Sequence, residues 1–209
     1  IDAIVSPIEA IKRNKRLLHA GFMAMDPYTG HIKAWVGGIN YKYFQYDHVM
    51  QGRRQPGSAF KTIIYAAAID NGYLPWQQAV DFPVTFKVPG GTCTPQNWYK
   101  RYTGEKMTLR QAMARSVNSI TAYLMKQLGP DLVVDYARRL GIQSPLESVP
   151  AICLGTEDVS VYELVGAYST FMNKGVWTEP FYITRIEDKN GNVLEDTKSV
   201  VKRKNIYLR

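Results

Sequence analysis

The sequence predicts an α+β fold in which strands lie at both ends of the chain and helices lie between them. Three observations support this: two alternating segments near the start, helical patterns with capping signals in the middle, and a further alternating segment over residues 180–188. The 209 residues are 45% apolar and 21% charged, which is typical of a globular chain rather than a disordered one. This length fits one domain with its own core.

The first elements are predicted by their turn residues. Residues 21–26 and 31–36 alternate as strands, and Pro27–Gly30 between them favours a tight turn, so we expect an antiparallel hairpin. Residues 37–57 are predicted to form a loop rich in glycine and aromatic residues. The apolar stretch over residues 58–71 then predicts a largely buried helix, which ends where a glycine follows it.

The middle of the chain is predicted to be mainly helical. Residues 73–107 contain many turn signals, and we expect irregular structure there around one strand at residues 84–88. Two capping boxes, in which Ser or Thr precedes Glu or Gln by three positions, begin at Thr108 and Ser160. Helices are expected over residues 108–115, 119–128, 131–140 and 160–173.

The charge and the rarer residues exclude several classes of protein. The net charge is +8, but residues 197–209 hold five basic side chains and no acidic one, so residues 1–196 carry only +3. That is too little for a nucleic-acid-binding surface. Cys93 and Cys153 fit no metal-ligand spacing and are either buried thiols or one disulfide, and the three histidines are scattered. The longest apolar run has seven residues, against the roughly 20 of a membrane-spanning helix.

Ser58 and Lys61 are the candidate nucleophile and base. Residues three apart lie on one face of a helical turn, so their side chains can come within hydrogen-bond reach. A serine hydroxyl becomes a nucleophile when a base removes its proton, and a lysine amine can be that base when burial lowers its pKa. A helix start also offers free N–H groups that can stabilise an oxyanion. Ser199 and Lys202 have the same spacing without an apolar helix around them, and we interpret that pair as chance.

Ser116 and Asn118 form a second candidate pair, at a break between two predicted helices. Polar side chains at such a break can project into a cleft beside the nucleophile. The alternative interpretation is structural, because Ser and Asn favour helix ends, where their side chains cap backbone N–H groups. The spacing alone leaves both interpretations open.

Several separated motifs occur in order along the chain. They are Gly21–Gly38, Arg54–Lys61, Ser116–Asn118, Leu154–Thr156 and Ala167–Gly175. In this order they resemble the transpeptidase domain of class A penicillin-binding proteins, and the resemblance covers about residues 15–200. It implies the fold that penicillin-binding proteins share with serine β-lactamases: an antiparallel sheet flanked by helices, with an all-helical lobe.

The resemblance implies a role for each candidate residue. Ser58 would attack the D-Ala-D-Ala bond of a peptidoglycan stem peptide, and Lys61 would accept its proton. Ser116 would pass a proton to the leaving D-alanine, while Asn118 would orient Lys61 and bind the substrate's amide. An amine of a neighbouring stem would then attack the acyl-enzyme to form a cross-link, whereas a β-lactam would leave Ser58 acylated. No cofactor and no metal is implied.

The resemblance also implies a setting for the chain. Class A proteins carry a glycosyltransferase domain and a membrane anchor upstream, and their transpeptidase domain works on the periplasmic side of the bacterial inner membrane. We therefore expect residues 1–20 to be a linker and residues 197–209 to be a basic tail. Residues 21–196 would form an incomplete transpeptidase domain, with its helical lobe at about residues 108–175.

The family's third motif, Lys-Thr-Gly, occurs nowhere in the 209 residues. We therefore expect a chain truncated before that motif, without the C-terminal strands and with an uncovered apolar face on its first hairpin. Loss of the oxyanion donor on the third-motif strand would slow acylation about a hundred- to a thousandfold. Two alternatives stay open: a serine β-lactamase-like hydrolase, and a non-catalytic peptidoglycan-binding module whose aromatic loop, residues 41–46, contacts the ligand.

Overall fold

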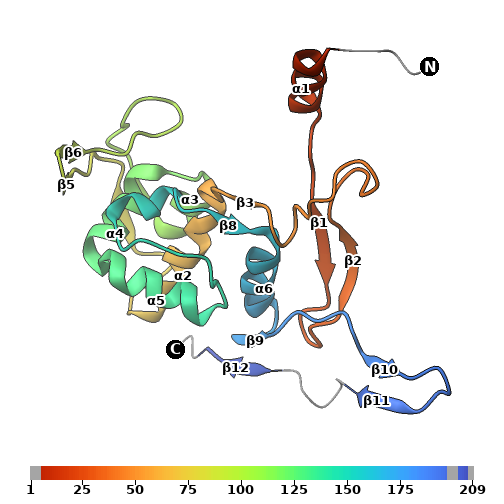
Figure 1. The fold of residues 1–209 in the computed structure, drawn as a ribbon. Coiled ribbons are helices and arrows are strands. Elements are labelled where there is room, and N and C mark those ends of the chain that lie inside the picture. The colour runs from red at the N-terminus through yellow and green to blue at the C-terminus, as the bar shows by residue number, and fades with distance from the viewer. Residues whose placement is uncertain (1–5, 197–201, 207–209) are drawn as a thin grey trace.

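Helices form the middle of the chain, as the sequence predicts. The computed structural model describes residues 6–196 and 202–206, and most of its helices gather around α2 (Figure 1). Their bounds are α1 Pro7–Arg16, η1 Gly57–Phe60, α2 Lys61–Asp70, α3 Leu109–Ala114, α4 Asn118–Leu128, α5 Pro130–Arg139, η2 Pro150–Leu154 and α6 Val161–Met172. Within the described residues, none of the helices has the length and apolar character needed to span a membrane.

The strands are short, and within the described residues they form six antiparallel pairs. These pairs are β1–β2, β3–β8, β4–β7, β5–β6, β9–β12 and β10–β11. Their bounds are β1 Phe22–Met25, β2 Ile32–Val36, β3 Arg53–Arg54, β4 Gln78–Val80, β5 Phe86–Val88, β6 Gly91–Cys93, β7 Lys106–Thr108, β8 Val159–Ser160, β9 Val176–Thr178, β10 Arg185–Glu187, β11 Val193–Asp196 and β12 Arg203–Asn205. This mixture of helices and antiparallel strands confirms the α+β class.

The core of the helical lobe surrounds α2. This helix is apolar on all sides and packs against α4 and α5, which is the pattern expected of a buried helix. Ile63 and Ile64 of α2 are fully buried, as are Ile120 and Leu124 of α4. The alanines of α2 allow the neighbouring helices to approach closely, and this packing holds Lys61 at the buried start of the helix.

Both predicted capping boxes are present. The Thr108 hydroxyl accepts from the N–H of Gln111 at 3.2 Å, and the Gln111 side chain accepts from the N–H of Thr108 at 2.9 Å. Ser160 and Glu163 repeat the arrangement at the start of α6. Local sequence therefore determined where α3 and α6 begin, because each cap joins residues only three positions apart.

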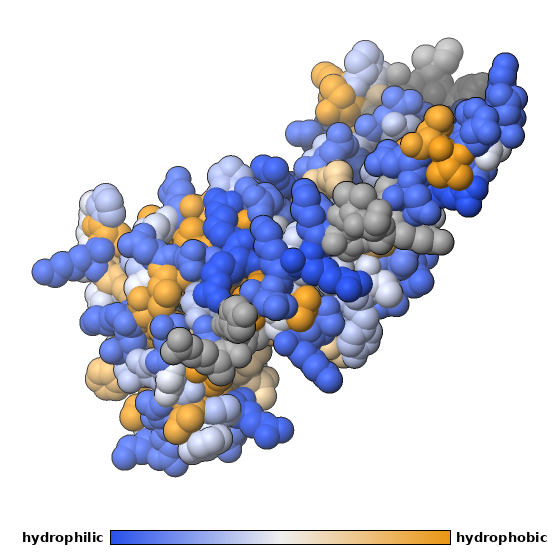
Figure 2. All heavy atoms as spheres, turned by 90° about the horizontal axis from the view of Figure 1, so that it is seen from below, coloured by the Kyte–Doolittle hydropathy of each residue, from blue (hydrophilic) through white to orange (hydrophobic). Residues whose placement is uncertain are grey.

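The first hairpin packs one face against α6. In the β1–β2 pair, Met23 lies opposite Trp35, and Met23 is buried; α6 contacts β1. The opposite face carries the pair Phe22 and Val36, which are 57% and 50% exposed. One apolar face of the hairpin is thus uncovered, as expected. Elsewhere, seen from below, the surface is mainly hydrophilic with separate apolar patches (Figure 2).

Several strands differ from the sequence prediction. Residues 73–107 are not simply irregular, because they contain three strands beyond the expected one. The last predicted strand, residues 180–188, is reduced to β10, and residues 180–182 instead bridge to the hairpin through His31 and Phe181. Residues 203–205, expected in a basic tail, form β12 and pair with β9. The partners in these pairs lie far apart in sequence, and no local pattern marks them. Ser199 lies outside the described residues.

A helix from outside the predicted lobe, residues 108–175, packs against helices within it. The α2 helix, which precedes residue 108, lies at the centre of the lobe (Figure 1), while α6 contacts both β1 and β9. The expected linker, residues 1–20, contains α1, which projects from the rest of the chain in Figure 1. The domain boundaries themselves stay a prediction.

Candidate active site

Ser58 lies in the tight turn that leads into α2. Gly57, just before it, has φ +56°, a left-handed conformation that glycine adopts without strain. The predicted helix begins with the 3₁₀ turn η1, which places Ser58 one turn before Lys61. The Ser58 side chain is exposed, so its hydroxyl is accessible to a ligand.

The backbone of Gly155 supports this turn. The N–H of Gly57 donates to the carbonyl of Gly155 at 3.2 Å. Gly155 follows η2 with φ +66°, and an ideal Cβ placed on it would lie only 2.2 Å from the carbonyl oxygen of Gly57. Only glycine permits so close an approach of the two backbones. The Leu154–Thr156 motif therefore contacts the nucleophile's turn directly.

The Lys61 amine is buried and fully engaged. The residue is 3% exposed, and its Nζ donates to the carbonyl of Ser116 at 2.8 Å, to Ser116 Oγ at 2.9 Å and to Asn118 Oδ1. Burial lowers the pKa of Lys61 from 10.5 to about 8. A negative charge on the nearby Cys153 sulfur would raise the pKa of Lys61, but only while that thiol is ionised. Burial raises the pKa of Cys153 to about 12, so that thiol is neutral near pH 7. A substantial fraction of the Lys61 amine can therefore lose its proton.

Ser116 connects the nucleophile to the amine. Its Oγ donates to Ser58 Oγ at 3.1 Å while accepting from Lys61 Nζ at 2.9 Å. The described hydrogen bonds include none between Ser58 and Lys61, so the direct contact expected from their spacing is replaced by a relay through Ser116. Ser116 has φ +54°, a left-handed backbone that costs a non-glycine residue about 1–3 kcal/mol.

Asn118 is the first residue of α4, and both the oxygen and the nitrogen of its side-chain amide form hydrogen bonds. Its Oδ1 accepts from Lys61, and its Nδ2 donates to the carbonyl of Gln96 at 2.7 Å. The side chain therefore joins the Lys61 amine to the backbone of the preceding segment. Both side chains bond within this cluster, and neither accepts from an N–H at the start of α4. The cap of α4 comes instead from Asn97, whose side chain accepts from the N–H of Asn118 at 2.9 Å.

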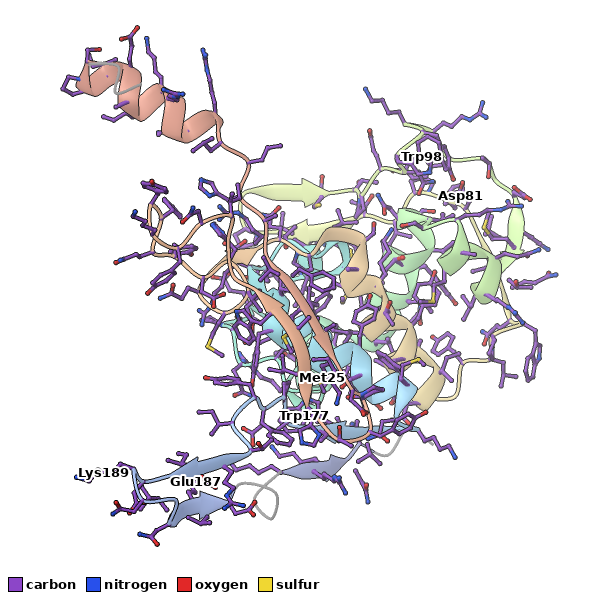
Figure 3. All side chains as sticks on the ribbon, turned by 90° about the vertical axis from the view of Figure 1, so that its right-hand side faces the viewer. Met25, Asp81, Trp98, Trp177, Glu187 and Lys189 are labelled. Carbon is purple, nitrogen blue, oxygen red and sulfur yellow. The ribbon has the colours of Figure 1, made fainter. Side chains whose placement is uncertain are left out.

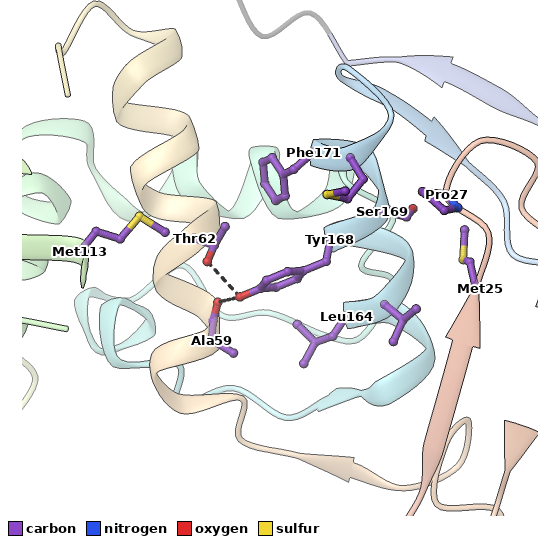
Figure 4. A pocket seen from close by; sticks show the side chains of 11 residues that line it. Met25, Pro27, Ala59, Thr62, Met113, Leu164, Tyr168, Ser169 and Phe171 are labelled. Atoms are coloured by element: carbon purple, nitrogen blue, oxygen red, sulfur yellow. Dashed lines mark hydrogen bonds between the residues drawn. The ribbon is translucent and has the colours of Figure 1, made fainter. Parts of the chain in front are cut away.

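An apolar groove of about 820 Å³ lies beside the site, between α2, α6 and the hairpin (Figure 4). Tyr168 reaches across it, and its hydroxyl donates to the carbonyl of Ala59 at 2.7 Å and contacts Thr62 Oγ1 at 2.9 Å. Because Ala59 directly follows Ser58, the groove adjoins the nucleophile's turn. Its lining residues are Met25, Pro27, Ala59, Thr62, Met113, Leu164, Val165, Tyr168, Ser169, Phe171 and Met172.

The structure also shows the surroundings of the two cysteines and of the aromatic loop, residues 41–46. Cys93 and Cys153 are free thiols rather than a disulfide; Cys153 is buried, but Cys93 is only partly buried. In the aromatic loop, Phe44 packs against His19 with ring centroids 4.5 Å apart, whereas Tyr43 is 80% exposed. Within residues 6–196 and 202–206, no three His, Cys, Asp or Glu side chains gather where they could hold a metal ion.

Comparison with known proteins places this site in a family. A family model described as the penicillin binding protein transpeptidase domain matches residues 20–207. The chain belongs to this family. The matched region continues to residue 207, beyond residue 200, where the resemblance seen in the sequence ended. It therefore includes β12, which lies in the segment that the sequence predicted to be a basic tail.

Individual penicillin-binding proteins are similar over most of the chain. Penicillin-binding protein 2D of Bacillus subtilis is 36% identical over 181 residues, which is 85% of this chain and 26% of that protein. Penicillin-binding protein 1A of Pseudomonas aeruginosa is 33% identical and covers 84% of this chain and 22% of its own length. The crystal structure of penicillin-binding protein 1A from Haemophilus influenzae has a TM-score of 0.78 at 30% identity, with 85% of this chain and 27% of that chain covered. The chain thus spans about a quarter of these relatives.

The four candidate side chains of the sequence analysis lie together in the structure, but two buried polar residues next to them were missed. Asn97 and Asp81 lie in the segment predicted to be irregular, and both are buried. Buried polar side chains need partners, yet a single Asn or Asp among turn residues looks like an ordinary loop residue. The only local signal is that both lie between the two candidate motifs.

Proposed function

We propose that this chain carries the acyl-transfer centre of a peptidoglycan DD-transpeptidase, with Ser58 as nucleophile. The observation that carries the proposal is the hydrogen-bonded relay from Ser58 Oγ through Ser116 Oγ to the buried Lys61 amine. Such a relay couples a weakly nucleophilic hydroxyl to a base. Membership of the transpeptidase family supports the same chemistry.

Acylation begins when Ser58 Oγ attacks the carbonyl carbon between the two D-alanines of a stem peptide. The Ser58 proton passes to Ser116 Oγ, whose own proton passes to the neutral amine of Lys61. The tetrahedral adduct then collapses: its carbon–nitrogen bond breaks, and the proton returns from Lys61 through Ser116 to the departing nitrogen of D-alanine. The product is an ester between Ser58 and the remaining stem peptide.

Cross-linking follows by the reverse exchange. The amine of a neighbouring stem attacks the ester carbonyl and gives up a proton to the relay, the Ser58–carbon bond breaks, and Ser58 Oγ regains its proton. A β-lactam acylates Ser58 in the same way, because opening of its ring breaks the equivalent amide bond. Its leaving nitrogen stays attached to the acyl group, so the ester persists.

The lowered pKa of Lys61 suits this role. With a pKa of about 8, roughly a tenth of the amines are neutral at pH 7, against less than about a thousandth for an unperturbed lysine. A base whose pKa lies near the working pH combines availability with driving force for proton transfer. Asn118 and the Ser116 carbonyl keep the amine directed at Ser116 Oγ throughout.

The wider setting belongs to this proposal as well. The relatives are named penicillin-binding proteins 1A and 2D, and the chain spans about a quarter of their length. We place its work on peptidoglycan outside the bacterial inner membrane, in a protein with the upstream membrane anchor and glycosyltransferase domain of class A proteins. Peptidoglycan stem peptides and β-lactam antibiotics are the proposed ligands.

Intact-mass analysis after incubation with benzylpenicillin tests the proposal. We expect a slow, single penicilloyl adduct on the 209-residue chain and no adduct on Ser58→Ala. Ser199→Ala is the matched control, because Ser199 and Lys202 have the same spacing, and it should acquire the adduct like the unchanged chain. Failure of the unchanged chain to acquire an adduct, or an adduct on Ser58→Ala, would refute the assignment. Repeated turnover of nitrocefin would instead favour the alternative function, a serine β-lactamase-like hydrolase.

A further inference from the structure

The start of α4 is capped from a distant part of the chain. The first N–H groups of a helix have no acceptor within the helix, and Val117, at the N-cap position, makes no side-chain cap. Asn97 Oδ1 accepts from the N–H of Asn118 at 2.9 Å and from that of Ser119 at 3.1 Å. Asn97 is 3% exposed, so these are bonds made away from solvent. A side chain about twenty positions earlier thus fixes the first turn of α4.

Asp81 determines which way the Asn97 amide faces. The Asp81 side chain is fully buried, and its Oδ1 accepts from Asn97 Nδ2 at 2.7 Å and from Ser119 Oγ at 2.5 Å. A carboxylate only accepts hydrogen bonds, so the NH₂ group of Asn97 must face it and the amide oxygen must face α4. Asp81 Oδ2 accepts from the hydroxyls of Tyr99 and Thr103 at 2.8 and 2.9 Å.

The Asp81 carboxylate is held in its charged form. Burial opposes ionisation, but the hydrogen bonds from Ser119, Thr103, Tyr99 and Asn97 outweigh it and keep the pKa of Asp81 below its usual range. Figure 3 shows Asp81 beneath the loop that carries Trp98, where this segment meets the helices. The network therefore spans the segment between the two active-site motifs and ends on α4.

The active-site turn lies between this cap and α3. Ser116 has the left-handed φ of +54°, and such a backbone persists only when both flanks are fixed. On one flank the N–H of Val117 donates to the carbonyl of Ala112 in α3 at 3.0 Å. On the other flank Asn97 holds the N–H of Asn118. All three acceptors of the Lys61 amine, the Ser116 carbonyl, Ser116 Oγ and Asn118 Oδ1, lie within this turn.

We propose that Asn97, oriented by buried Asp81, is a positioning residue of the active site, which fixes the Ser116–Asn118 turn and through it the Lys61 amine. The inference rests on the proposed acyl transfer for its catalytic consequence, but the positioning itself can be measured without catalysis. Removal of the cap frees the start of α4, and a displacement of about 1 Å at a catalytic group can cost about a hundredfold in rate.

Asn97→Ala is the main test, with Thr85→Val as its matched control. Thr85 bonds Thr94 at 2.8 Å in the same segment but is exposed, and neither residue belongs to the cap or the turn. Tyr99→Phe is a milder variant that removes one donor to Asp81 and keeps Asn97, in case Asn97→Ala does not fold. All variants are compared well below their unfolding temperatures.

Two measurements do not require catalysis. Amide hydrogen exchange of Asn118 and Ser119 should be at least tenfold faster in Asn97→Ala than in Thr85→Val, with a smaller increase in Tyr99→Phe. Competitive acetylation across pH should show the labelling midpoint of Lys61 moving above its starting value near 8 in Asn97→Ala, because water reaches the loosened amine. Loss of global stability alone would speed exchange at buried amides of α2 and α4 alike and would leave the Lys61 midpoint unchanged, so exchange at Asn118 and Ser119 is compared with exchange at buried amides of α2.

The third measurement is the rate of Ser58 acylation by benzylpenicillin, which should fall about ten- to a hundredfold in Asn97→Ala and remain unchanged in Thr85→Val. Unchanged exchange at Asn118 and Ser119 would overturn the inference, as would faster exchange with an unchanged Lys61 midpoint. If the unchanged chain forms no adduct, the proposed acyl transfer fails, while exchange and Lys61 labelling still decide whether Asn97 positions the turn.

Discussion

Gly155→Ala should displace the backbone turn that carries Ser58. An ideal Cβ at residue 155 would lie 2.2 Å from the carbonyl oxygen of Gly57, 2.7 Å from its nitrogen and 2.9 Å from its carbonyl carbon. All three contacts are with backbone, so no side chain can rotate away to relieve them. The neighbouring backbone must therefore move by about 1 Å to restore ordinary contact distances, and the residue that moves directly precedes Ser58.

The expected cost has two parts. Alanine at φ +66° pays the left-handed penalty of about 1–2 kcal/mol, and the backbone overlap adds about 1–3 kcal/mol. Gly72→Ala is the matched control, because Gly72 has φ +95° but an added Cβ would meet nothing within 4 Å. We expect Gly72→Ala to lose only the first part and Gly155→Ala to lose about 2–5 kcal/mol of unfolding free energy.

Urea denaturation and the rate of penicilloyl adduct formation measure the two consequences. A shift of about 1 Å beside Ser58 should slow acylation of Gly155→Ala about a hundredfold, whereas Gly72→Ala should acylate at the rate of the unchanged chain. Equal destabilisation of the two variants, together with equal acylation rates, would show that the backbone contact between residues 57 and 155 does not position the nucleophile.

Three further predictions concern the relay and the fold. Acylation of Ser58 should rise with pH and level off above about 8, because only the neutral Lys61 amine accepts the proton; a flat stopped-flow profile from about pH 6 to 9 would contradict this. Burial opposes ionisation of Glu163, but hydrogen bonds from Ser144 and Ser160 outweigh it and lower the pKa of Glu163 below its ordinary value of 4.5. The carboxylate therefore stabilises the fold above pH 4.5 and progressively less at lower pH. In denaturant titrations, Glu163→Gln should thus cost about 1–3 kcal/mol at pH 7 and progressively less as the pH falls below 4.5; a cost that stays constant with falling pH would exclude the carboxylate as the cause. Leu124→Ala should cost about 2–5 kcal/mol by the same titration yet leave acylation within about twofold, and a loss below about 1 kcal/mol would mean that α4 is not packed as described.

The candidate site was predictable where its chemistry is local. Ser58 and Lys61 lie three positions apart on one turn, and the burial of the following helix is visible in its run of apolar residues. The Thr108 and Ser160 caps were predictable for the same reason, because each joins residues three positions apart. Even so, spacing predicted a direct contact between Ser58 and Lys61, and the structure has Ser116 between them.

The sequence by itself determined the α+β class, the first hairpin, the starts of α3 and α6, and the residue types of the site. Each depends on neighbours within a few positions, where propensity and capping act. Only the tertiary structure decided that Ser116 would bridge the relay, that Asn97 would cap α4, that Gly155 would contact Gly57 and that β12 would pair with β9. These contacts join residues that are far apart in the chain and are set by packing around α2, which no local pattern records.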